Sequence, residues 1–166
     1  MFQKHSKWLI INYIQRKMSD NIGGITNARL ALVKSIAIIK ENLFSVEIGF
    51  KENEGWNNIP SGKYGVSVDV KPSYSDAGDI YNVTVVISVP RQCVTDDLLK
   101  EYRQLIKFGT IFSYTVTDGT YVVGSKSFPL KGSLEAVQSK TATGFSGYRL
   151  TFTCKQTFGQ RLLTSL

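Results

Sequence analysis

Residues 81–90 read YNVTVVISVP and alternate apolar side chains with smaller or polar ones. Successive side chains of a β-strand point to opposite sides of the sheet, so this alternation predicts a strand with one face on a core. That face consists of Tyr81, Val83, Val85, Ile87 and Val89. Residues 64–70 repeat the pattern, and the turn-forming residues in between mark 71–80 as a long connection. We therefore predict two antiparallel strands joined by that connection.

Residues 95–109, TDDLLKEYRQLIKFG, follow shortly afterwards and carry the signals of a helix. Thr95 suits the N-cap, Asp96 and Asp97 face the positive end of the helix dipole, and Gly109 suits the position after the last turn. One apolar stripe comprises Leu98, Leu99, Tyr102, Leu105 and Ile106. We expect this helix to cover a sheet, with the two aspartates acting as capping residues rather than as a catalytic pair.

Shorter segments on both sides of this centre complete the fold. We predict strands or hairpins at residues 46–50, 111–125, 134–138 and 148–155, and irregular segments at 53–62 and 139–147. Residues 27–41 are predicted as extended, although apolar residues at helical spacing leave a helix open. These elements predict an α+β fold, a mostly antiparallel β-sandwich or partial barrel with one principal helix packed on it.

The composition is that of a globular protein, because 42% of the 166 residues are hydrophobic and 20% are charged. We expect residues 19–166 to form a single domain. The formal net charge is +7. Residues 1–18 supply +4 of it, because they contain four basic residues and no acidic one. The remaining +3 is a solubility property, so no specific nucleic-acid partner is expected.

Residues 1–18 are predicted to be a basic amphipathic extension, or a start assigned too early, since Met18 could itself begin the protein. The extension resembles a secretory signal, but Asn12 interrupts its apolar run and no small-residue cleavage site follows. A helix lying on a membrane surface or on a partner is an alternative. We expect a protein that is cytoplasmic at synthesis and does not bind a membrane.

Residue types that catalysis and metal binding use are scarce in the domain. The single histidine, His5, lies in the extension, which leaves no histidine base and no Ser-His-Asp set. Cys93 and Cys154 lie far apart without a metal-ligand spacing, so we expect buried, reduced thiols. Residues 76–79 lack the ligand series of a calcium loop. We expect no enzymatic activity, no cofactor, and no catalytic, metal-binding or cofactor-binding residues.

Asp118-Gly119 lies in the middle of the predicted hairpin 111–125, IFSYTVTDGTYVVGS. Asp-Gly is typical of a tight two-residue turn because both positions there take positive φ. We interpret the pair as a corner without chemistry of its own.

Two ligand-binding alternatives remain open. A β-sandwich module for carbohydrate would use Trp56, Tyr74 and Tyr81 as stacking platforms. A basic nucleic-acid-binding protein would need aromatic and cationic side chains on one sheet face. The alternation in 148–155 argues against the latter, because it puts Arg149 and Lys155 on the face opposite Tyr148 and Phe152.

The order of features resembles that of small proteins encoded among the structural genes of phages and prophages of Bacteroides-type gut bacteria. The resemblance covers residues 18 to about 158. It rests on MSDNIGGI at 18–25, VPR at 89–91, the helix, the Asp118-Gly119 turn into YVVG at 121–124, and GYRLTFT at 147–153. It implies a non-enzymatic virion protein of the tail or the head-tail junction. The tail-tube proteins of long-tailed phages are similar in plan.

This resemblance also implies how the protein acts. The expected partners are further copies of the chain and other virion proteins, and the expected location is the virion if the chain is phage-encoded. The hairpin with Asp118, Gly119 and Tyr121 is then an assembly element. Long alternating strands leave unpaired edges unless a neighbour pairs with them, and ring assembly is one way to do so.

Overall fold

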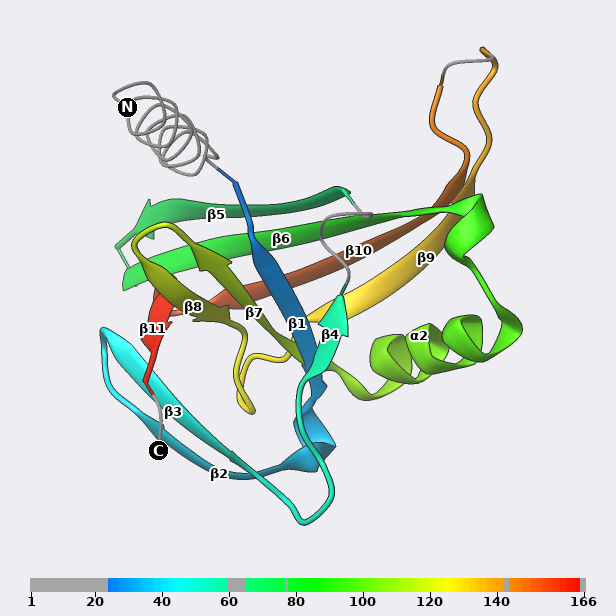
Figure 1. Ribbon diagram of the computed structural model, residues 1–166. Coiled ribbons are helices and arrows are strands. Elements are labelled where there is room, and N and C mark those ends of the chain that lie inside the picture. Colours follow the sequence, from blue (N-terminus) through cyan, green and yellow to red (C-terminus); the bar gives the residue numbers. More distant parts are fainter. Residues whose placement is uncertain (1–23, 60–64, 77, 142–143, 165–166) are drawn as a thin grey trace, which may run out of the picture.

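The computed structural model describes residues 24–59, 65–76, 78–141 and 144–164. Within these residues two β-sheets pack together beside one α-helix (Figure 1). The seven-stranded sheet has the order β2-β3-β11-β8-β7-β1-β4, and the four-stranded sheet has the order β5-β6-β10-β9. The predicted α+β fold with mostly antiparallel, sandwich-like sheets is confirmed. The predicted extension 1–18 lies outside the described residues.

The bounds of the elements are as follows. The seven-stranded sheet contains β1 (Asn27–Leu32), β2 (Ile36–Glu41), β3 (Ser45–Phe50), β4 (Asn57–Ile59), β7 (Thr110–Val116), β8 (Gly119–Val123) and β11 (Arg161–Leu163). The four-stranded sheet contains β5 (Gly65–Ser75), β6 (Gly78–Pro90), β9 (Lys131–Val137) and β10 (Gly147–Gln156). The helical segments are η1 (Val33–Ser35), η2 (Arg91–Cys93) and α2 (Asp96–Phe108).

The β5–β6 hairpin corrects the prediction of a loop at 71–80. Its strands stay paired from Gly65 opposite Ser88 to Ser75 opposite Gly78, so the predicted connection is almost entirely strand. Pro72 is tolerated because β5 is an edge strand, where the missing N–H interrupts no ladder. Gly78 takes a φ of +116°, which favours glycine at the turn. Tyr64 and Ala77 lie outside the described residues.

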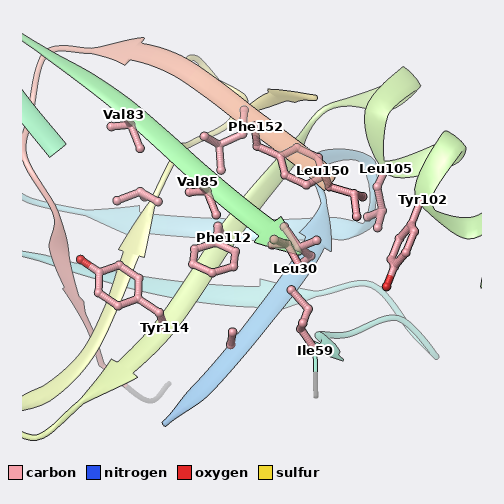
Figure 2. Close-up of a cluster of buried hydrophobic side chains, with 14 of the residues drawn as sticks. Leu30, Ile59, Val83, Val85, Tyr102, Leu105, Phe112, Tyr114, Leu150 and Phe152 are labelled. Carbon is pink, nitrogen blue, oxygen red and sulfur yellow. The ribbon is translucent and has the colours of Figure 1, made fainter. Parts of the chain in front are cut away.

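The main core lies between the two sheets. β6 contributes its predicted face, since Val83, Val85, Ile87 and Val89 are all buried. Figure 2 shows side chains of β6 and β10 meeting those of β1 and β7, with Phe152 and Phe112 among the largest that are fully buried. Burying an aromatic or branched side chain stabilises a fold by about 1.5–3 kcal/mol, so this cluster holds the sandwich together.

Helix α2 begins and ends as predicted and covers the core beside β9. The Thr95 hydroxyl accepts a hydrogen bond from the Leu98 N–H at 3.2 Å, and Gly109 ends the helix with a φ of +74°. A side chain at Gly132 of β9 would place its Cβ 2.5 Å from the Phe152 ring and 2.9 Å from Ile106. The absence of a side chain at Gly132 therefore lets the helix approach the sheet.

Residues 27–41 form β1, η1 and β2, so the extended prediction is confirmed over the alternative helix. The β2–β3 hairpin supplies Ile36 and Val46 to a second buried cluster with Ile111 and Val122. Ile111 neighbours Phe112 in β7 and therefore points to the opposite face of the sheet. The seven-stranded sheet thus has the main core on one face and this second cluster on the other.

Two three-residue strands were not predicted from the sequence. β4 lies within the segment predicted as turns and pairs with β1. β11 connects β3 with β8, pairing parallel to β3 and antiparallel to β8. Because β11 lies between β3 and β8, the β2–β3 hairpin pairs with the rest of its sheet, within the described residues, only through Arg161–Leu163.

Two buried polar side chains, Gln156 and Arg161, connect the C-terminal part of the chain to the rest of the fold. Gln156 accepts a hydrogen bond from the Gly124 N–H at 3.0 Å and donates to the carbonyls of Phe158 and Gly159 at 2.8 and 3.0 Å. Arg161 is 2% exposed, and its Nη1 donates to Oε2 of Glu41 in β2 at 2.8 Å. Its guanidinium also stacks on the Phe158 ring.

Candidate functional site

The β7–β8 hairpin brings Asp118 and Tyr121 together. Thr117 and Asp118 form the turn, and Gly119 is already the first residue of β8, paired with Val116. The Tyr121 hydroxyl donates to Asp118 Oδ2 at 3.0 Å. This hydrogen bond crosses the turn and holds the exposed Asp118 carboxylate against the strand that follows it.

The predicted φ angles of this turn are wrong. Among the described residues, positive φ occurs at Asn53, Gly78, Gly109 and Gly124, and neither Asp118 nor Gly119 is included. Gly119 lies close to β11 instead. A Cβ there would lie 2.9 Å from Cδ1 of Leu162, so a larger residue would require the Leu162 side chain to move.

Tyr114 leads from the hairpin toward the core. Its ring lies 5.9 Å from that of Tyr121 and 5.9 Å from that of Phe112, and its hydroxyl donates to Gln160. Burial raises the pKa of Tyr114 to about 12, and the nearby Tyr121 and Asp118 add to the rise. The pKa of Tyr121 is also raised, first by its hydrogen bond to Asp118. Both phenols therefore stay protonated at neutral pH and do not supply a base.

The raised pKa of Tyr114 predicts a loss of stability at high pH. The folded state holds the proton more tightly than the unfolded chain, so the stabilisation is complete below pH 10 and disappears as the pH rises to about 12. We expect the free energy of unfolding of the wild type to fall over this range by on the order of 2 kcal/mol more than that of Tyr114→Phe. Urea unfolding at a series of pH values measures this difference. Parallel pH profiles of the two proteins would contradict it.

Trp56 does not form the exposed platform that carbohydrate stacking would use. Its ring packs edge-on against Phe50, with centroids 5.4 Å apart, and the Arg29 guanidinium lies 5.2 Å from its centroid. It is half-buried beside the second cluster. Trp56 therefore caps the outer side of the seven-stranded sheet.

Tyr74 and Tyr81 lie on the other sheet, in the β5–β6 hairpin. Tyr74 is exposed, whereas Tyr81 is half-buried, and a Cβ at Gly159 would lie 3.5 Å from its ring. The structure therefore does not bring Trp56 together with the two tyrosines (Figure 1).

The outer face of the four-stranded sheet carries hydroxyl and charged groups. The strand registers place Ser67, Val86, Thr151 and Ser133 in one row and Asp69, Thr84, Thr153 and Lys131 in the next. Arg149 and Lys155 lie on this face, whereas Phe152 points into the core. The predicted separation of cations from aromatics in β10 is confirmed. A base-stacking surface of the kind that binds single-stranded nucleic acid would need both on one face.

A cavity of about 510 Å³ lies where β9 begins beside β10. Lys131 and Lys155 line it with Thr84 and Thr153, and Phe128 forms an apolar wall. Within the described part of the chain, neither lysine has an ion-pair partner. Its lining complements an anionic or polar group. Burial raises the pKa of the Cys154 thiol to about 11, so this thiol stays protonated at neutral pH.

Other chemistry-bearing groups are sparse in residues 24–59, 65–76, 78–141 and 144–164. Cys93 and Cys154 are free and half-buried, rather than fully buried as predicted. Across these residues no three His, Cys, Asp or Glu side chains gather as a metal-ligand group. None of the helices in this part of the chain combines the length and apolar character needed to cross a membrane.

Two surface features of the structure were not predicted from the sequence. β5 is an eleven-residue edge strand. Leu43 and Phe44, in the turn between β2 and β3, are 76% and 82% exposed, although their residue types favour the interior. Both features are suited to binding another protein chain.

No protein-family model matches this chain, and no curated protein or solved structure matches it.

Proposed function

We propose that this chain is a non-enzymatic structural protein of a phage virion, a component of the tail or of the head-tail junction that works by self-assembly. The observation that carries the proposal is the free edge of β5. In the part of the chain that the structure describes, β5 pairs with β6 on one side and with no strand on the other. The virion class comes from the order of sequence features, and the free edge supports self-assembly.

Such an edge exposes a row of backbone N–H and C=O groups that another strand can pair with. Pro72 has no N–H, so the part of β5 available for continuous pairing is Gly65–Lys71. Asp69 and Lys71 form an ion pair at 2.6 Å along this strand. A second copy that pairs here would extend the four-stranded sheet across two subunits.

The outer face beside this edge supports the same reading. Its serine and threonine hydroxyls can form many modest polar contacts with an adjacent subunit, and such contacts are common at the rims of protein interfaces. Assembly through an edge and a polar face needs no catalytic residue. Subunits that paired through these surfaces in varying orientations would form irregular aggregates. A test of self-assembly must therefore detect particles of constant shape.

We expect the full-length protein to form rings or stacked tubes as its concentration rises. Light scattering over a concentration series measures the mass, and negative-stain images of the same samples show the shape. A monomer at every concentration would contradict self-assembly. Defined particles of constant diameter would distinguish virion-like assembly from aggregation.

The edge itself is tested by Ser67→Lys, because a lysine on an edge strand hinders pairing with another strand. Thr151→Lys is the matched control, since Thr151 lies in the same row of the sheet but in the interior strand β10. We expect Ser67→Lys to weaken assembly more than Thr151→Lys. Equal loss in the two variants would place the contact on the sheet face and not on its edge.

A further inference from the structure

The turn between β2 and β3 is a fixed apolar protrusion. Oδ1 of Asn42 accepts hydrogen bonds from the N–H groups of Phe44 and Ser45 at 2.9 and 2.8 Å. The Asn42 N–H donates to the Ser45 carbonyl at 3.0 Å, and the Leu162 N–H donates to the Phe44 carbonyl at 2.8 Å. These bonds hold the backbone in place, so Phe44 can bind a partner without a large loss of backbone entropy.

Phe44 is the most exposed large apolar side chain in the described part of the chain, at 82%, with Leu43 beside it at 76%. Leu162 of β11, which contacts the same turn through its backbone, is also exposed. Single exposed apolar residues are ordinary on protein surfaces, but two adjacent ones that protrude from an ordered turn, as Leu43 and Phe44 do, suit an interaction site.

A small groove with an apolar floor, which could accept an apolar side chain, lies between β4 and α2. Its floor consists of Leu30, Ile59, Leu98, Tyr102 and Leu105, and its rim of Asn57, Asn58 and Glu101. Figure 2 shows Leu30, Ile59, Tyr102 and Leu105 converging at this end of the main core. The groove has a volume of about 150 Å³. An apolar cavity of about that size accommodates one benzene molecule, which is the size of a phenylalanine ring.

We propose that Phe44 of one copy inserts into the β4–α2 groove of a second copy. The volume of the groove matches one phenyl ring, its floor is apolar, and its amide-bearing rim can hydrogen-bond to the backbone of the entering turn. β4 is itself an edge strand, so Asn57–Ile59 can also pair with that backbone. This inference rests on the proposed self-assembly and names a contact through which it occurs.

The two halves of this contact lie apart on the molecule. The β2–β3 turn is at the left of Figure 1, whereas β4 and α2 are at the centre and right. A heterologous, head-to-tail contact joins different surfaces of identical subunits, and it repeats until it closes into a ring or continues as a filament. Because its two halves lie on separate parts of the subunit, we expect the Phe44 contact to form a ring or a filament of subunits.

The first test removes each half separately. Phe44→Ser removes the protruding ring, and because the ring is exposed we expect the variant to fold normally. Asn57→Trp fills the groove from its exposed rim, because Asn57 pairs with Leu30 and shares its face of the sheet. We expect each variant to raise the concentration at half-assembly about tenfold or more, since burial of a phenylalanine contributes at least that much to association. Phe108→Ser, at another exposed phenylalanine, is the matched control and should assemble as the wild type does.

The second test mixes the two variants. Phe44→Ser retains a free groove, and Asn57→Trp retains a free Phe44, so one head-to-tail contact can form between them and none can follow it. We expect a one-to-one heterodimer in the mixture when each variant alone is monomeric. Light scattering coupled to size-exclusion chromatography measures both states, and circular dichroism checks the fold of each variant. If Asn57→Trp does not fold, Glu101→Trp fills the groove from the helix side.

The outcomes separate this inference from the proposed function. A wild type that assembles while Phe44→Ser assembles equally well overturns the Phe44 contact and leaves self-assembly standing. A mixture of two monomeric variants that stays monomeric also overturns the head-to-tail contact. A wild type that is monomeric at every concentration overturns both proposals.

Discussion

We expect Gln156→Leu to lower the free energy of unfolding by about 3 kcal/mol, which is a large fraction of the stability of an ordinary domain. Leucine fills nearly the same volume as glutamine, so the loss comes from hydrogen bonding and not from packing. The substitution leaves three backbone groups without their partner: the N–H of Gly124 and the carbonyls of Phe158 and Gly159. Each buried unsatisfied group costs about 1–3 kcal/mol, and the deeply placed Gly124 N–H has the least access to water.

Urea unfolding of Gln156→Leu and the wild type measures this loss. Gln138→Leu, at an exposed position after β9, is the matched control and should change stability by less than about 0.5 kcal/mol. Gln156→Glu should be more damaging than Gln156→Leu, because it places a carboxylate against the two carbonyls that Gln156 now donates to. A Gln156→Leu variant as stable as the control would show that water replaces all three hydrogen bonds.

In the ion pair of Arg161 and Glu41, we expect removal of the exposed Glu41 to lower the free energy of unfolding more than removal of the buried Arg161. Glu41→Gln leaves a 2%-exposed guanidinium without its counter-charge, and two of its nitrogens already have no hydrogen-bond partner within the described structure. We expect a loss of about 3 kcal/mol. Arg161→Met replaces the charge by an apolar chain of similar length against Phe158, and it leaves Glu41, 43% exposed, to be hydrated. We expect Arg161→Met to cost less than half as much.

A double-mutant cycle checks this order. In the Arg161→Met background, Glu41→Gln should have almost no further effect, because the charge that needed a partner is absent. Glu47→Gln is the control, since Glu47 is the acid of a more exposed pair with Lys40. If Arg161→Met lowered the free energy of unfolding more than Glu41→Gln, the ion pair itself would be a net source of stability.

The strands and the helix with a sustained pattern could be predicted from the sequence. The alternation through Val83–Val89 and the capped stripe of residues 95–109 both involve enough residues to distinguish a period of two from a period of 3.6. β4 and β11 could not be predicted, because three residues show no period. Pro72, Asp76 and Gly78 are turn-forming residues, so the sequence of 71–80 predicts a connection. The segment is mostly strand instead, because an edge strand tolerates proline.

The surface features were less accessible to sequence reasoning. Trp56 lies among polar, turn-forming residues and is partly exposed, but its contacts with Phe50 and Arg29 could not be predicted from the sequence. Phenylalanine is usually buried, so the residue type of Phe44 favours the core. Its exposed position in the turn between β2 and β3 is known only from the structure. The burial of Arg161 also depends on Glu41, 120 positions away in the sequence. Contacts of this range leave no local pattern.

The position of β11 also bears on how the protein is made. Ser45 of β3 pairs with Leu162, and 117 residues separate them. A ribosome adding roughly 5–20 residues per second needs about 6–23 s to cover that distance. Until then the β2–β3 hairpin has no neighbouring strand to complete its sheet, and an isolated hairpin is only marginally stable in water. The nascent chain therefore exposes this apolar hairpin for that period, until the last strand pairs with it.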